Sequence, residues 1–350
     1  MSFLIPLLVI LIISFLSLTS ISLTLGLNQL LFVVIGLLAF VIFSRLPYSL
    51  HRYLIKIYSA GVVIFLLLPF LFGTLTRGAV RWIQLGPLTL QPSEIAKPFL
   101  IIIFSYFLSR PAKNYLLQIT YYGLLLVIPA ILVFKQPDLG SALVIVAIWL
   151  GILFASKISF RKLVIFFIAF LIITPLAWRG LKSYQQQRFA SFLNPYADPK
   201  ASGYHLIQSV ISVGSGGFLG KGLGHGSQSQ LKFLPERQTD FIFASLSEEW
   251  GFIGSASLIL AYFFLLKWLL TVTAKAPDEF GRLIGIGVFS LIFFQTIVNL
   301  GMNLGLLPIT GITLPLISSG GSSILAISIC LGLVNNISKA GLSHRPLEIK

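Results

Sequence analysis

Long runs of apolar residues, separated by short polar segments, make up most of the chain. A helix that crosses the hydrocarbon core of a membrane, about 30 Å thick, needs about 20 such residues in succession. The runs predict about ten membrane-spanning helices, at residues 4–25, 27–44, 53–72, 92–109, 115–134, 138–155, 162–178, 241–270, 281–305 and 316–338. The short alternating segments of a membrane β-barrel are missing from this pattern. We therefore predict an all-α membrane protein that forms one polytopic domain over residues 1–350, with one large extracytoplasmic loop between helices 7 and 8, at residues 179–239.

Composition supports this prediction. Hydrophobic residues make up 56% of the chain and charged residues 10%, and the mean hydropathy is +0.95. A soluble domain carries about 25% charged residues, with which it covers its surface. The first apolar run has neither a basic segment before it nor a convincing cleavage site, so we expect a retained helix rather than a signal peptide. The single cysteine, Cys330, excludes an intramolecular disulfide.

The distribution of charge predicts the topology. The net charge is +15, yet the basic residues lie at the ends of the apolar runs and form no separate block, which argues against nucleic-acid binding. Basic residues at the termini and the even-numbered loops outnumber those at the short odd-numbered loops, which are Arg77, Arg81, Lys97 and Lys135. The positive-inside rule then predicts that both termini are cytoplasmic. Residues 179–239 and most of the ten acidic residues fall on the outer side, where we expect a site built from carboxylates.

Two polar segments at the start of predicted helices are candidate sites. In residues 91–97, Glu94 and Lys97 are three positions apart and share one helix face, so they can pair. In residues 135–141, Asp138 follows a proline at the head of an apolar helix, where a carboxylate suits the positive end of the helix dipole. A structural ion pair and a helix cap are the alternatives to a binding site. Because ionisable groups in membrane segments are costly, the functional interpretation stays open for both segments.

Asp240 is the most suggestive candidate. It ends a charged and polar segment directly before a long apolar helix. A helix cap is again the structural alternative. A carboxylate at the boundary between water and lipid is partly desolvated, which raises its pKa and suits a base. At 100° per residue, Glu248 lies about 80° around the helix from Asp240 and Glu249 nearly opposite, so we do not expect both to share a pocket with it.

The glycine-rich segment at residues 214–226 is not predicted to bind a nucleotide. A phosphate-binding loop would need glycine at position 215 and serine or threonine at position 222, where the chain has Ser215 and Gly222. No strand is predicted before it, and we expect a flexible outer loop. The four histidines show no metal-ligand spacing.

Residues 307–323 interrupt an apolar region with prolines, glycines and hydroxyl side chains. Non-helical backbone at membrane depth is either buried in protein or lines a polar cavity. The backbone amides around Ser319 and Gly320 are therefore candidates for binding an anion.

These segments together resemble the SEDS family (shape, elongation, division and sporulation), whose polytopic members polymerise lipid II into peptidoglycan. The matching motifs extend from about Arg81 to Val334, and the family-like pieces are residues 91–97, 136–140, 235–243 with 248–249, and 308–323. The last piece is the hallmark of the family. Residues 228–236 resemble the RodA branch, which serves elongation, rather than the FtsW branch, which serves division.

The resemblance implies a peptidoglycan glycosyltransferase with inverting transfer. The donor would be a growing chain on undecaprenyl pyrophosphate, and the acceptor the 4-hydroxyl of the GlcNAc of lipid II. Asp240 matches the essential aspartate of the family and would be the general base. Cationic side chains and a divalent cation, Mg²⁺ or Mn²⁺ with unknown ligands, would neutralise the pyrophosphate leaving group, and Glu94 would orient Lys97. The expected substrate-binding residues are Arg81, Glu94, Lys97, Asp138, Ser319 and Gly320.

The resemblance also implies partners and a location. We expect a class B penicillin-binding protein as a separate chain, because residues 179–239 carry no Ser-x-x-Lys nucleophile motif. We expect a multi-pass protein of the bacterial cytoplasmic (inner) membrane, in contact with membrane lipid, with its active site facing outward and no nucleotide or organic cofactor. A lipid II flippase and a scaffold that only recruits the penicillin-binding protein are the alternatives. The acidic residues on the outer side favour the enzyme, because a flippase should show polar groups at both mouths.

Overall fold

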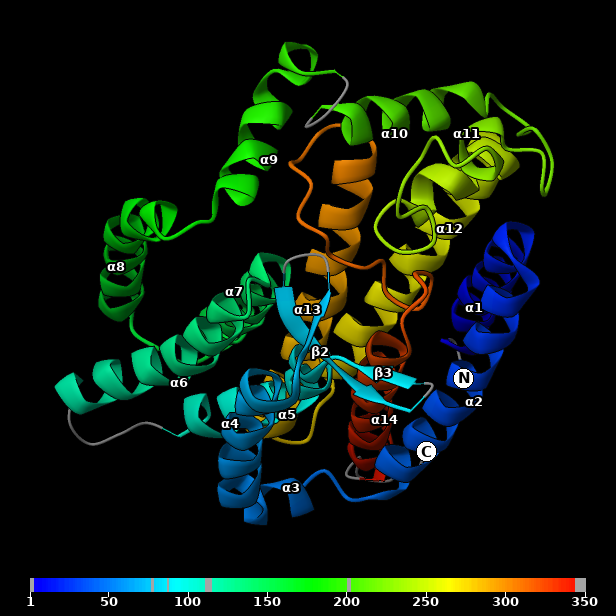
Figure 1. Ribbon diagram of the computed structural model, residues 1–350. Coiled ribbons are helices and arrows are strands. Elements are labelled where there is room, and N and C mark those ends of the chain that lie inside the picture. Colours follow the sequence, from blue (N-terminus) through cyan, green and yellow to red (C-terminus); the bar gives the residue numbers. More distant parts are fainter. Residues whose placement is uncertain (1–2, 77–78, 87, 111–114, 200–202, 344–350) are drawn as a thin grey trace. The chain divides into compact units, whose positions relative to one another are not determined.

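A computed structural model describes residues 3–76, 79–86, 88–110, 115–199 and 203–343 (Figure 1). Arg77, one of the residues behind the predicted topology, lies outside these ranges. Each of the predicted spans coincides with one helix, which confirms the helical fold class. These helices are α1 (Leu4–Ile21), α2 (Leu23–Arg45), α4 (Ile55–Phe72), α5 (Pro92–Leu108), α6 (Tyr115–Lys135), α7 (Leu139–Ala155), α8 (Phe160–Arg179), α12 (Ile242–Ala274), α13 (Glu279–Asn303) and α14 (Gly321–Ser343).

Shorter elements connect these helices. Helix α3 (Leu50–Tyr53) joins α2 to α4. The segment predicted as the large outer loop, residues 179–239, contains further helical turns: α9 (Ser183–Leu193), the 3₁₀ helix η1 (Pro195–Ala197), α10 (Tyr204–Ser215) and α11 (Ser227–Gln230). The last long helix begins at Gly321 and not at residue 316, because the preceding residues form turns and bends.

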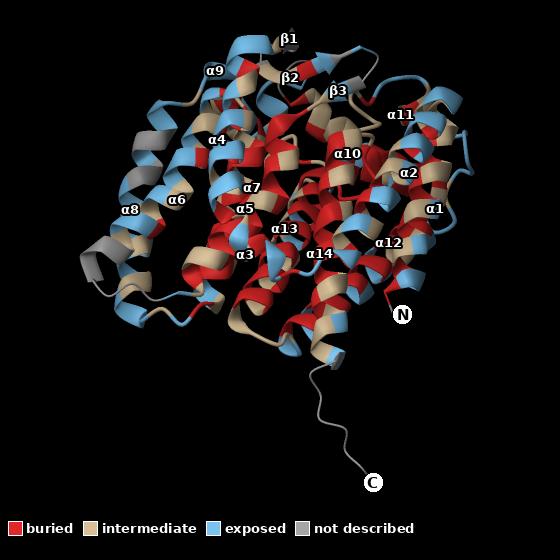
Figure 2. Ribbon diagram, turned by 90° about the horizontal axis from the view of Figure 1, so that it is seen from below, coloured by how far each residue is buried: buried red, intermediate tan, exposed pale blue. Residues whose placement is uncertain are grey.

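The exposed surface of several helices is apolar, which defines a multi-pass membrane protein. Among the described residues, six helices are long and apolar enough to cross a membrane: α1, α2, α4, α12, α13 and α14. Figure 2 shows α8 largely as exposed and α5 largely as buried. The exposed side chains include Leu8, Ile64 and Phe167, each more than half accessible. Water would make such faces unfavourable, whereas lipid chains solvate them at no cost in hydrophobic free energy.

The chain divides into two compact units, and each is described here by itself. The first unit consists of Met1–Val33, Ile172–Leu265 and Phe293–Gly320. The second consists of Val34–Leu171, Leu266–Ile292 and Gly321–Lys350. In the second unit, α5 packs against α4, α7 and α14, and α6 packs against α7.

The second unit also contains a small antiparallel sheet, which the pattern of apolar runs did not predict. Its strands are β1 (Thr74–Thr76), β2 (Ala79–Leu85) and β3 (Leu88–Leu90), in the order β1-β2-β3. Strand β2 pairs with both neighbours, in a register that places Thr74 opposite Trp82 and Ile83 opposite Leu90. Gly86, with φ +62°, adopts the left-handed conformation that the tight turn between β2 and β3 requires. The sheet contacts α4, α5 and α14, and so carries Arg81 to the start of α5.

In the first unit, helix α12 contains a break at Gly251. This residue has φ +65° and ψ −159°, a conformation that is essentially restricted to glycine. A Cβ atom on Gly251 would lie 2.3 Å from the backbone nitrogen of Gly220, so the glycine-rich segment passes directly over the break. The amides of Phe252 and Ile253, which the break frees from helical bonding, donate to the carbonyls of Gly217 and Phe218 at 2.9 and 3.3 Å.

Candidate functional site

In the second unit, Asp138 joins the sheet to the starts of α5 and α7. It is the N-cap of α7, where its carboxylate accepts a hydrogen bond from the amide of Ser141 at 3.2 Å. Its Oδ2 accepts from Gln91 Nε2 at 2.7 Å and from Ser93 Oγ at 3.1 Å. Arg81 Nη1 of β2 lies 3.5 Å from Oδ1. The cap predicted from the sequence is therefore present, together with a cation and two donors from elsewhere in the chain.

The predicted Glu94–Lys97 pair is also present in the second unit. Pro92 occupies the first turn of α5, where its missing N–H leaves no donor unsatisfied, and Gln91 is the N-cap. Lys97 Nζ, on a side chain that is 1% exposed, donates to Glu94 Oε1. A buried ammonium needs such a partner, because an unpaired charge there would cost several kcal/mol. The charge of Lys97 is thus already compensated within its own helix.

In the first unit, Asp240 lies in a turn directly before α12 and is half-buried. Two buried asparagines of α13 hold its backbone. Asn299 Nδ2 and Asn303 Nδ2 donate to the carbonyl oxygen of Asp240 at 3.1 and 3.0 Å. Asn303 Oδ1 accepts from the amide of Ala244, in the first turn of α12, at 3.0 Å. These bonds fix both the backbone of Asp240 and the start of the helix that follows it.

In the interrupted segment at residues 304–320, residue 312 and residues 314–318 are buried in protein, one of the two environments predicted for it, whereas Leu304 and Leu306 are exposed. Ser318 Oγ donates to the carbonyl of Thr239 at 2.7 Å, and the amide of Ser319 donates to the carbonyl of Gln238 at 2.9 Å, so the segment is bonded to the turn that carries Asp240. Its own carbonyls accept from side chains of four helices: Ile317 from Ser14 of α1, Leu316 from Gln29 of α2, Pro315 from Tyr262 of α12, and Ile312 from Asn299 of α13. These side chains supply the partners that a helix would otherwise provide.

Arg188, which was not among the predicted site residues, lies near Asp240. A Cβ atom built on Gly311, which has φ +73°, would lie 3.4 Å from Asp240 Oδ2 and 3.7 Å from Arg188 Nη1. Arg188 belongs to α9, is exposed, and donates through Nη1 to the carbonyl of Ile309 at 3.4 Å. Its guanidinium also lies 5.8 Å from the ring centroid of Tyr184. A carboxylate, a guanidinium and a glycine without a side chain therefore surround one small space.

His205 of α10 lies close enough to Arg188 and Glu236 for their charges to shift its pKa. The ring of His205 stacks on Phe241 with 6.2 Å between centroids. Burial lowers the pKa of His205, the positive charge of Arg188 lowers it further, and the negative charge of Glu236 partly opposes both. His205 is therefore neutral near pH 7 and adds no positive charge near Arg188.

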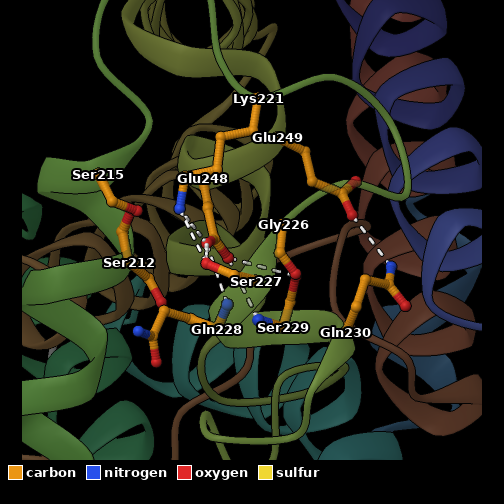
Figure 3. Close-up of polar contacts among 10 residues, drawn as sticks. All are labelled: Ser212, Ser215, Lys221, Gly226, Ser227, Gln228, Ser229, Gln230, Glu248 and Glu249. Atoms are coloured by element: carbon orange, nitrogen blue, oxygen red, sulfur yellow. Dashed lines mark hydrogen bonds and ion pairs between the residues drawn. The ribbon is translucent and has the colours of Figure 1, made fainter.

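The two glutamates of α12 have their own partners, in agreement with the helical geometry that separated them from Asp240 (Figure 3). Glu248, which is fully buried, accepts from Lys221 Nζ at 2.7 Å and from the amides of Gln228 and Ser229 at 3.0 and 3.2 Å. Glu249 accepts from Gln230 Nε2 at 3.2 Å and from a serine of α1. The glycine-rich segment, expected to be a flexible loop, is thus bonded to α12 at several points. Glu248 and Glu249 thus hold residues 221 and 228–230, which precede Asp240 in the chain, against α12.

The predicted site residues therefore form two groups. Asp240, Ser319 and Gly320 lie in the first unit, where Ser319 is bonded to the turn of Asp240. The other predicted residues, which are Arg81, Glu94, Lys97 and Asp138, lie in the second unit. There Arg81 faces Asp138, and Lys97 pairs with Glu94. Together with Arg188, which was not predicted, the first group offers a carboxylate near a cation, an arrangement suited to removing a proton from a hydroxyl near an anionic group.

Known proteins are similar to this chain in fold and in sequence over nearly its whole length. The profile of the FtsW, RodA and SpoVE family, described as cell cycle protein, matches residues 1–341. The peptidoglycan glycosyltransferase MrdB of Escherichia coli (strain K12) is 38% identical over 307 residues, which cover 87% of this chain and 83% of that protein. The crystal structure of the rod shape determining protein RodA of Thermus thermophilus has a TM-score of 0.73 and 28% identity, and the match covers 98% of this chain and 97% of that one.

A further solved structure is described by the words "Structural coordination of polymerization and crosslinking by a peptidoglycan synthase complex". It matches with a TM-score of 0.82 and 30% identity, over 96% of this chain and 97% of that chain. Fold and site together define a multi-pass membrane protein with a carboxylate-centred polar site. The chain belongs to the FtsW, RodA and SpoVE family, which is the SEDS family that its motifs predicted.

Proposed function

We propose that this protein polymerises lipid II into glycan strands during cell elongation, with Asp240 as the general base. The class of enzyme does not depend on that mechanism. Relatives that match most of this chain are named peptidoglycan glycosyltransferases, and solved RodA structures share its fold. The chain is a peptidoglycan glycosyltransferase of the RodA type.

The observation that supports the mechanism is the geometry at Asp240. Its carboxylate is half-buried, its backbone is fixed by two asparagines, and Gly311 keeps the adjoining space free of a side chain. In the proposed step, Asp240 takes the proton of the acceptor hydroxyl. The oxygen then forms a bond to the anomeric carbon of the donor sugar, and the bond from that carbon to the pyrophosphate breaks. The electron pair leaves with the pyrophosphate, a good leaving group that needs no acid. General base catalysis of this kind contributes about 10²- to 10⁴-fold in rate.

The remaining predicted residues support substrate binding in this proposal. In the second unit, Arg81, whose guanidinium faces Asp138, and Lys97, which Glu94 holds in place, would contribute positive charge to the binding of an anionic group. The amide of Ser319 is occupied by the carbonyl of Gln238, so the hydroxyl of Ser319 and the amide of Gly320 would be the donors that this segment adds beside Asp240. We place the site on the outer side of the bacterial inner membrane and both termini in the cytoplasm, because basic residues prevail in the predicted cytoplasmic loops.

A divalent cation fits this donor set only as an ion that the substrate shares. No group of three or more His, Cys, Asp or Glu side chains able to hold a metal occurs in the part of the chain that the structure describes. Mg²⁺ commonly needs only one or two protein carboxylates when substrate phosphates supply the other ligands. The half-buried Glu236 is the carboxylate that would contact such an ion, which would neutralise the charge of the pyrophosphate and leave Asp240 free to take a proton.

A class B penicillin-binding protein is the partner we propose, as the chain that cross-links the product. The solved synthase complex that resembles this chain combines polymerisation with crosslinking, which supports such a pairing. Recovery of this protein from mild detergent without any penicillin-binding protein, in repeated copurifications, would count against it.

The proposed function is tested with purified lipid II and detergent-solubilised protein, with and without Mg²⁺ or Mn²⁺. A transpeptidase-inactive class B penicillin-binding protein is supplied, so that the enzyme is assayed in the proposed pairing without cross-linking of its product. We expect long glycan strands. A parallel sample in sealed vesicles measures movement of lipid II across the membrane. Absence of glycan with the partner bound, together with transfer of lipid II across the vesicles, would refute the proposal in favour of a flippase.

A further inference from the structure

Arg188 is placed to contact whatever Asp240 acts upon. Its Nη1 and Asp240 Oδ2 lie within 4 Å of the same point in space, the position of a Cβ on Gly311, at 3.7 and 3.4 Å. The two residues come from different elements, α9 and the turn before α12, and both belong to the first unit. Gly311 has φ +73°, so the backbone conformation as well as the space disfavours a side chain between them.

The guanidinium of Arg188 has capacity for a ligand. It carries five N–H donors, and among the described residues it makes one hydrogen bond, at 3.4 Å to the carbonyl of Ile309, which is long for N–H···O. Its other contact is the ring of Tyr184, which orients the planar group without using its donors. The cations assigned to the substrate from the sequence differ in this respect, because Lys97 is paired with Glu94 and Arg81 with Asp138.

We propose that Arg188 binds the pyrophosphate of the donor lipid, across the reacting carbon from Asp240. This inference rests on the proposed function and adds a substrate-binding residue to it. A base reaches its hydroxyl over about 3 Å, the hydroxyl oxygen approaches the reacting carbon to about 3 Å, and a guanidinium reaches a phosphate oxygen over about 3 Å. The carbon–oxygen–phosphorus bonds of the donor connect the reacting carbon to the phosphate oxygen, and with bends at the hydroxyl and at the phosphorus these legs join Asp240 to Arg188.

The donor pyrophosphate fits this place better than the pyrophosphate of the acceptor. The leaving oxygen is bonded to the carbon that is attacked, so its phosphate lies next to the reaction centre. The pyrophosphate of the acceptor lies at the far end of a disaccharide from the attacking hydroxyl. As the bond between carbon and oxygen breaks, negative charge grows on the leaving pyrophosphate, and a bidentate guanidinium stabilises that charge. The reacting proton goes to Asp240, and Arg188 keeps its own.

The variants Arg188→Gln and Arg188→Lys test the proposal, with Arg179→Gln as the matched control. Arg179 ends α8, is exposed, and carries the same charge on the same outer segment. We expect Arg188→Gln to lower kcat for lipid II polymerisation about 10²- to 10³-fold, the usual effect of removing one transition-state donor. Arg188→Lys should recover part of this loss, and Arg179→Gln should behave as the wild type.

Direct binding separates the pyrophosphate from other roles of Arg188. Undecaprenyl pyrophosphate and the neutral undecaprenol are the probes, and we expect Arg188→Gln to weaken binding of the first at least tenfold and to leave the second unchanged. Lipid II without its stem peptide is the substrate of a second arm. A defect that disappears with this substrate would show that Arg188 binds a carboxylate of the peptide, and would overturn the proposal.

Two further outcomes would also contradict the proposal. If Arg188→Gln only shifts the acidic limb of the pH profile of kcat, Arg188 tunes the charge of Asp240 and does not bind the leaving group. If the variant unfolds at a lower temperature than the wild type but binds undecaprenyl pyrophosphate equally well, Arg188 only tethers α9 to Ile309. Should the wild type form no glycan, the proposed function fails, while the binding comparison still decides whether Arg188 holds a pyrophosphate.

Discussion

Replacement of Asn303 by leucine tests how the backbone of Asp240 is held. Asn303 is fully buried, and its side chain joins three backbone groups: it donates to the carbonyls of Asp240 and Asn299 at 3.0 and 2.8 Å and accepts from the amide of Ala244 at 3.0 Å. Leucine has a similar volume but offers no hydrogen bond. The variant therefore removes the bonds without leaving a large cavity.

The magnitude of the effect follows from the groups left without partners. Ala244 is fully buried, so its amide would lose its acceptor out of contact with water, at about 1–3 kcal/mol of stability. The carbonyl of Asp240 keeps the bond from Asn299 at 3.1 Å, so its loss is smaller. Because a displacement of about 1 Å in a reacting group can cost about 10²-fold in rate, we expect kcat to fall about 10- to 100-fold and KM to change little.

The assay compares thermal unfolding in detergent and the kinetics of lipid II polymerisation. Gln295→Leu is the control, since Gln295 is a buried amide on the same helix whose Oε1 has no hydrogen-bond partner among the described residues. Its replacement should be neutral or stabilising. If Asn303→Leu matched Gln295→Leu in both stability and kcat, the asparagine would not hold the catalytic turn, and the reasoning would be wrong.

Three further predictions concern single residues. Burial lowers the pKa of His51, in α3, from 6.5 to about 4. The unfolded state therefore binds the proton first, and stability falls as the pH drops from about 6.5 to 4. His51→Phe should flatten that part of a thermal stability profile by about 3 kcal/mol, and an unchanged profile would refute the prediction. Gly251→Ala would place a Cβ 2.3 Å from a backbone nitrogen and should destabilise the folded protein by more than about 3 kcal/mol. Gly61→Ala, inside α4, would place a Cβ with no atom within 4 Å and should be neutral or stabilising. Equal melting temperatures of the two variants would contradict this prediction. Asp138→Asn should lose about 1–3 kcal/mol of stability, because Asp138 accepts two side-chain hydrogen bonds and faces a guanidinium. Thermal unfolding compares it with Asp198→Asn, at an exposed position, and equal stability of the two variants would show that this network is weak.

The helices could be predicted from sequence because their signal is local. Membrane spans need long apolar runs, and the runs coincide with helices in every case. The Glu94–Lys97 pair follows from spacing on one helix, and the capping role of Asp138 from its place after a proline. The last span was predicted to begin at residue 316, but its helix begins at Gly321, because apolar composition continues through backbone that side chains of other helices keep non-helical.

The surroundings of Asp240 could not be predicted, because they depend on contacts between distant segments. Arg188 precedes Asp240 on a separate helix, and Gly311 follows it in an irregular segment, so no spacing rule joins the three. The small sheet had a local signal, since residues 79–90 alternate around Gly86-Pro87, but the short strands were overlooked beside the long apolar runs. The glycine-rich segment has a composition typical of flexible loops, and only the structure reveals that Lys221 within it donates a hydrogen bond to Glu248 of α12.

The measurement that tests the central claim most directly is lipid II polymerisation by Asp240→Asn, compared with the wild type and with Asp198→Asn, each with the inactive partner enzyme bound. Asparagine keeps the shape of the side chain but cannot take a proton at neutral pH. The account predicts long glycan from the wild type and from Asp198→Asn, and at least about 10²-fold less from Asp240→Asn, with the same melting temperature and the same affinity for undecaprenyl pyrophosphate. Glycan formed by Asp240→Asn at the wild-type rate would show that Asp240 is not the base and would contradict the account.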